Sequence, residues 1–96
     1  MSQRKFQHNN YAVLTGWDRP LQYHFLLIED ITTPLDDEGI VFNNLHRRNP
    51  GMTLREIEDE LNKLNIPIPP GLISDLKNDK ITNVGNLTKD YGRTHG

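Results

Sequence analysis

The stretch from Tyr11 to Glu29 constrains the fold most, because it holds the longest apolar run and the only tryptophan. It predicts two strands joined by a tight connection at Trp17-Asp18-Arg19-Pro20, where the proline has no N–H to donate to a ladder. The second strand contains Phe25-Leu26-Leu27-Ile28, which is apolar on both faces. Because a lone hairpin is marginal in water, the rest of the chain must supply a third strand and a helical layer.

The third strand is predicted at Ile40-Val41-Phe42, a short β-branched and aromatic run after the turn-rich connection 30–39. A strand here would lie antiparallel to the second strand and complete a meander. A short helix over residues 42–47 is the competing interpretation of the same residues.

Two helices are predicted in the second half of the chain. Thr53 and Glu56 have the spacing of a capping box, which marks a helix start. Pro67 ends that helix, and a second one is expected over roughly residues 71–80. Apolar residues recur at helical spacing in both segments and predict the faces that pack on the sheet: Leu54, Ile57, Leu61, Leu64, Leu72, Ile73 and Leu76.

These elements predict an α+β fold in the order β-β-β-α-α, a three-stranded antiparallel meander with two C-terminal helices packed on one face. The 96 residues suit a single small domain. Residues 1–9 and about 88–96 are polar, so we expect them to be flexible, although Phe6 is large enough to tuck against the sheet.

Composition narrows the classes of function. The chain has no cysteine, which excludes disulfides and thiolate chemistry, and its net charge of −2 disfavours a generic polyanion binder. No apolar run approaches a membrane span and no secretory signal is apparent, so we expect a cytoplasmic protein that does not contact membranes.

No pattern in the sequence indicates a cofactor or a metal. The four histidines, at positions 8, 24, 46 and 95, lack the spacing of a zinc site. The acidic run Asp36-Asp37-Glu38 lacks the alternating ligands of a calcium loop. We also find no nucleophile motif and no phosphate-binding glycine loop, so we do not expect an enzyme.

Two exposed segments are candidates for binding a partner, since tryptophan and arginine often dominate interface energies. The first is the hairpin tip with Trp17, Asp18 and Arg19, although the tryptophan would instead cap the core if it folds back. The second is His46-Arg47-Arg48, for which ordinary solubilising charge is the simpler interpretation.

The leading hypothesis for function is a small non-enzymatic module that binds a protein partner, including a second copy of itself. With helices on one sheet face only, Leu26 and Ile28, or their neighbours on the opposite face, would lack cover, and an uncovered apolar face marks an interaction site. One alternative is a nucleic-acid-associated regulator using Arg4, Lys5, Arg47, Arg48 and the basic tail. Another is a small enzyme in which His24 or His46 meets a carboxylate.

Overall fold

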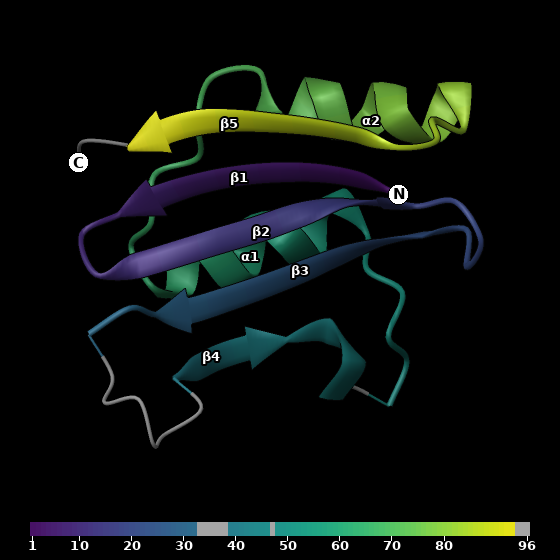
Figure 1. Ribbon diagram of the computed structural model, residues 1–96. Coiled ribbons are helices and arrows are strands. Elements are labelled where there is room, and N and C mark those ends of the chain that lie inside the picture. Colours follow the sequence, from purple (N-terminus) through teal and green to yellow (C-terminus); the bar gives the residue numbers. More distant parts are fainter. Residues whose placement is uncertain (33–38, 47, 94–96) are drawn as a thin grey trace.

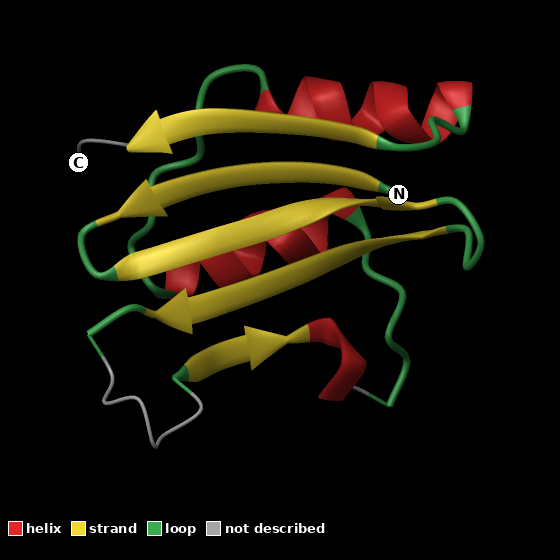
Figure 2. Ribbon diagram, in the orientation of Figure 1, coloured by secondary structure: helices red, strands yellow, loops and turns green. Residues whose placement is uncertain are grey.

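The fold is α+β, built on one mixed sheet with two helices (Figures 1 and 2). The computed structural model describes residues 1–32, 39–46 and 48–93, without the side chain of His46. The acidic run 36–38, Arg47 and His95 therefore lie outside the described residues. Five strands are hydrogen-bonded in the order β4-β3-β2-β1-β5, with these bounds: β1 Ser2–His8, β2 Tyr11–Asp18, β3 Tyr23–Asp30, β4 Ile40–Asn43 and β5 Leu87–Arg93.

The predicted three-stranded meander is present as β2, β3 and β4, but it is only part of the sheet. Each of these strands is antiparallel to the next. The competing helix over residues 42–47 is reduced to one 3₁₀ turn, Asn44–His46, which follows β4. The prediction of three strands is therefore correct for the middle of the chain and too small for the whole sheet.

The hairpin reverses two residues later than the sequence predicts. Trp17 and Asp18 still belong to β2, where they pair with His24 and Tyr23 of β3. The turn closes with the Gln22 N–H donating to the Asp18 carbonyl at 2.7 Å. In this register Trp17 points to the same side of the sheet as the helices, where it is buried. Burial of Trp17 therefore favours a hairpin whose strands extend beyond the turn that the sequence predicts.

The N-terminal segment is a strand of the sheet interior, not the flexible lead-in that the sequence predicts. β1 pairs antiparallel with β2 on one side and parallel with β5 on the other. Its buried positions are Ser2, Arg4, Phe6 and His8, which alternate as in any half-covered strand. Three of these four residues are polar, so hydrophobic patterning alone did not reveal the strand.

The C-terminal segment also differs from its prediction. Residues 87–93, expected to fray, form the edge strand β5 beside β1. Six of its seven residues are exposed, and Tyr91 is the exception. A parallel partner must come from far along the chain, in this case after two helices, so local sequence gives no sign of the pairing.

Both helices lie on one face of the sheet (Figure 1). α1, Leu54–Lys63, begins at the predicted capping box, in which the Thr53 hydroxyl accepts from the Glu56 N–H at 3.1 Å. α2, Leu72–Thr82, starts after Gly71, whose φ of 86° requires a glycine-like backbone. Between the helices and the sheet lies the apolar core, whose fully buried members include Leu26, Ile28, Ile57, Leu61, Leu72 and Leu76.

Gly16 fixes how closely β1 approaches β2. A Cβ built at this position would lie 2.0 Å from the backbone carbonyl oxygen of Ser2, closer than any side chain tolerates. The side chain of Ser2 then accepts from the Trp17 N–H at 2.8 Å and donates to Asp79 at 2.8 Å. Only glycine at position 16 permits this packing.

Candidate interaction face

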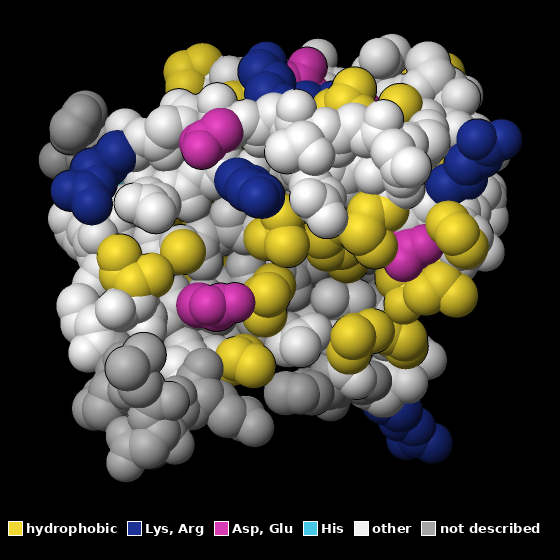
Figure 3. Space-filling view, in the orientation of Figure 1, with side chains coloured by type: hydrophobic (Ala, Val, Ile, Leu, Met, Phe, Trp, Pro, Cys, Tyr) yellow, Lys and Arg dark blue, Asp and Glu magenta, His cyan; other side chains and the backbone are white. Residues whose placement is uncertain are grey.

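The sheet face opposite the helices is the main candidate site, and we call it the open face. Side chains alternate along a strand, so the covered set Val13, Leu26 and Ile28 implies an opposite set. That set contains Leu14 on β2 and Leu27 on β3, both half-buried. Figures 1 and 3 look onto this face, and in Figure 3 apolar side chains gather over the middle of the sheet.

An apolar groove of about 280 Å³ runs across the open face. Its walls come from β2, β3 and the end of β4, from the hairpin turn, from the residues after β4 and from Met1. Leu21 and Leu45 are more than half exposed at its rim. The lining residues are Met1, Leu14, Asp18, Leu21, Tyr23, Phe25, Leu27, Asn43, Asn44 and Leu45. Exposed apolar patches rimmed by polar residues are a common mark of interaction sites.

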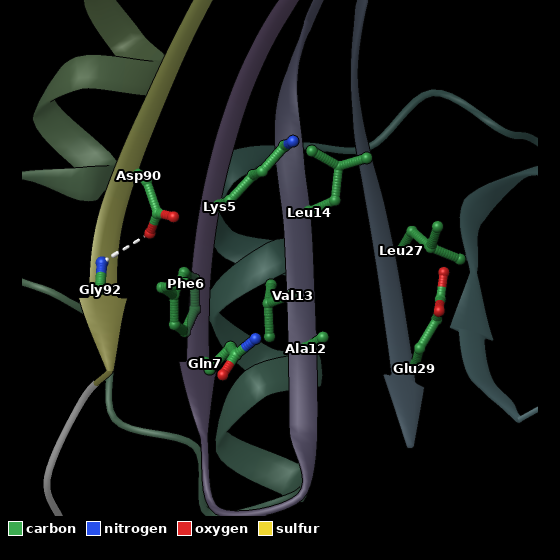
Figure 4. A pocket seen from close by; sticks show the side chains of 10 residues that line it. All are labelled: Lys5, Phe6, Gln7, Ala12, Val13, Leu14, Leu27, Glu29, Asp90 and Gly92. Atoms are coloured by element: carbon green, nitrogen blue, oxygen red, sulfur yellow. Dashed lines mark hydrogen bonds between the residues drawn. The ribbon is translucent and has the colours of Figure 1, made fainter. Parts of the chain in front are cut away.

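A second hollow, of about 300 Å³, shares Leu14 and Leu27 with the groove (Figure 4). Lys5 projects from β1 on one side of these leucines and Glu29 from β3 on the other. Both charged side chains are exposed. The open face therefore has an apolar centre flanked by charges of opposite sign.

Trp17 is buried and does not form part of an exposed hairpin tip. Its ring is 3% exposed, on the helix side of the sheet, and its Nε1–H donates to Asn83 Oδ1 at 3.0 Å. It also meets the His24 ring edge-on, with centroids 5.0 Å apart. The alternative in which this residue folds back onto the core is therefore the observed one.

The other residues predicted to bind a partner lie at two separate places. Asp18 is half-buried and its Oδ1 accepts from the Leu21 N–H at 3.2 Å, while Arg19 is exposed at the turn. Arg48, which follows the 3₁₀ turn in the chain, is exposed, whereas Arg47 and the His46 side chain are not described. Among the described residues of this predicted set, only Asp18 lines the groove.

A buried ionic cluster on the covered face was missed from the sequence. Arg4 of β1 makes a bidentate contact with Asp79 of α2, with Nε to Oδ2 at 2.8 Å and Nη2 to Oδ1 at 2.7 Å. Tyr91 of β5 accepts from Arg4 Nη1 at 3.0 Å and donates to Asp75 at 2.5 Å. Because Asp79 and Tyr91 occupy the Arg4 guanidinium, it is not available to bind the phosphate backbone of a nucleic acid.

The cluster shifts the titration of its members. The hydrogen bond from Tyr91 holds the pKa of Asp75 below its usual value. Burial, reinforced by that same hydrogen bond, raises the pKa of Tyr91 to about 12. The hydrogen bond to Asp79 raises the pKa of Arg4. These groups stay in one ionisation state near neutral pH, which suits a structural tie between strands and helix.

The histidine proposed for an enzyme site is also buried on the covered face. The Nε2–H of His24 donates to the Leu76 carbonyl at 2.8 Å, and burial lowers the pKa of its imidazole. It borders a cleft of about 570 Å³ between the two helices. Lys77 and Lys80 line that cleft, and no carboxylate appears among its described lining residues.

The described residues contain neither a cluster of metal-binding side chains nor a helix that could span a membrane. No group of three or more His, Cys, Asp or Glu side chains there could hold a metal ion. No helix in that part of the chain has the length and apolar character needed to cross a bilayer.

Comparison of the chain with protein-family models, with curated proteins and with solved structures gives no match in any of the three.

Proposed function

We propose that this chain is a small non-enzymatic module that acts by binding a protein through the open face of its sheet. The observation that carries the proposal is the continuous apolar surface centred on Leu14, Phe25 and Leu27. The two helices cover only the opposite face, so these side chains stay in contact with water until a partner removes them from it.

The energetics favour burial of this surface. Each square ångström of apolar surface removed from water is worth about 25 cal/mol before the costs of association are subtracted, so covering these side chains favours association. Tyr23 and Phe25 are aromatic, and aromatic side chains give large contact area at a low cost in side-chain entropy. The flanking charges of Lys5 and Glu29 would orient the partner and exclude others.

Photo-crosslinking in the cells that make the protein tests this function. A benzoylphenylalanine placed at Leu27 sits in the middle of the open face. The matched control is Ile81 on α2, an apolar residue that is 72% exposed but borders the helical side. We expect a discrete protein adduct from position 27 and none from position 81. Identical adducts from both positions, or none from position 27 in a folded chain, would contradict the proposal.

A further inference from the structure

We infer that the partner of the open face is a second copy of this chain, packed face to face about a twofold axis that runs along the strands between β2 and β3. This inference rests on the proposed function and names the occupant of the same surface. An axis in that place carries every open-face residue of β3 onto the β2 residue that it neighbours, but in the other copy. The register within one chain therefore states which residues would meet.

The register makes the open face complementary to itself. Phe25 lies beside Gly16, and Leu27 lies beside Leu14. The twofold axis would place the Phe25 ring of each copy over Gly16 of the other, where the Ser2 carbonyl fills the space that a Cβ would take. It would also set Leu27 against Leu14, so two leucines meet at the centre of the interface.

The charges on the flanks agree with the same axis. Lys5 lies on the β1 side of the centre and Glu29 on the β3 side, in neighbouring rows of the open face. Rotation about the axis brings each Lys5 towards the partner's Glu29, which gives two symmetric ion pairs at the rim. The net charge of −2 per chain is small, so long-range repulsion between copies is weak.

A stable interface buries roughly 800 Å² per partner. That area is a minor part of the 5996 Å² that the whole chain exposes.

The sheet edges are poorer places for a second copy. β4 has four residues, which gives a short ladder. β5 carries an irregular register beside β1, and Gly92 within it has a φ of 80°. Short strands and bulges at an edge oppose strand addition. Face-to-face packing is therefore favoured over edge pairing.

Sedimentation velocity over a concentration series tests the inference on the full chain. We expect a species of twice 11.1 kDa, with Leu27→Lys raising the dissociation constant of the dimer at least about 100-fold. Ile81→Lys, which places the same charge on the helical side, should leave the dissociation constant unchanged. A chain that stays monomeric at every concentration, or a dimer whose dissociation constant is unchanged by Leu27→Lys, would overturn the inference.

Charge reversal tests the orientation of the two copies. Lys5→Glu alone and Glu29→Lys alone should each weaken the dimer about tenfold, because each replaces two symmetric attractions by repulsions. The double variant should restore the original dissociation constant, a rescue that no folding defect would produce. A double variant as weak as the single ones would overturn this arrangement.

The two proposals fail in distinguishable ways. A monomer whose position 27 crosslinks to a different protein would remove the second copy as partner and keep the binding function. A monomer that gives no adduct at position 27 would remove both.

Discussion

Arg4 and Asp79 show at the residue scale how a polar pair can replace apolar residues in a core. The two residues are 6% and 2% exposed, and their side chains meet through two short hydrogen bonds. They are 75 positions apart in the chain, so no local pattern links them. The capping box at Thr53 and Glu56 was predictable because its partners are three residues apart and interact through the backbone of one turn.

Removing one member of this pair should destabilise the fold strongly. Asp79→Ala leaves the Arg4 guanidinium buried without its main partner, and we expect the free energy of unfolding to fall by about 3–5 kcal/mol. Urea denaturation measures this loss. Asp59→Ala removes an exposed carboxylate from α1 and should change the same quantity by less than about 0.5 kcal/mol. Equal effects of the two variants would show that the buried pair is not formed.

His24 predicts a dependence of stability on pH. Burial, with a smaller effect of Lys80, lowers the pKa of this imidazole below its ordinary value of about 6.5. The unfolded chain therefore binds a proton more readily than the folded chain as pH falls below 6.5. The contribution to stability is fully present above that pH and is lost towards the lower pKa of the folded state.

The expected slope from His24 is at most about 1.4 kcal/mol of unfolding free energy per pH unit. Urea denaturation between pH 7.5 and 5 measures it, and His24→Gln should remove that part of the slope. An NMR titration of the ring gives the folded pKa directly. A folded pKa at or above 6.5 would contradict the burial of this residue.

At the scale of elements, β1 and β5 separate what sequence could predict from what it could not. β2, β3 and α1 have apolar residues at strand or helix spacing, and all three were predicted. β1 carries Ser2, Arg4 and His8 on its covered side, and these polar residues hide its periodicity. The partner of both Ser2 and Arg4 is Asp79 of α2. β5 is nearly all exposed, and its pairing with β1 depends on tertiary contacts alone.

Gly16 gives a test of the β1–β2 contact. Gly16→Ala would force its Cβ against the Ser2 carbonyl, so we expect a loss of about 3 kcal/mol or more in the free energy of unfolding. Gly85→Ala is the matched control, because a Cβ there meets only Arg19 at an ordinary 3.5 Å and should be neutral or slightly stabilising. If both variants unfold at the same urea concentration, β1 does not lie against β2 as described.

On the scale of the whole molecule, one sheet face is covered and the other is open. The sequence predicted a bare face because residues 25–28 are apolar on both sides of the strand. The sequence left open which of the two faces the helices would cover, because the alternation of side chains along a strand does not determine it. It also left Trp17 divided between the hairpin tip and the core. In the structure, Trp17 hydrogen-bonds Asn83 at the end of α2 and His24 hydrogen-bonds Leu76 of α2, so both lie on the side that the helices cover.

Two adjacent leucines test the open face most directly, because they share a strand and differ only in the side to which they point. Leu26 is 0% exposed and Leu27 is half-buried on the open face. In a dilute, monomeric sample, a soluble paramagnetic agent should broaden the Leu27 methyl signals strongly and leave those of Leu26 sharp. When the partner binds, Leu27 should become protected while Ile81 stays broadened. Equal broadening of the two leucines in the dilute sample, or no protection of Leu27 in the complex, would contradict the account.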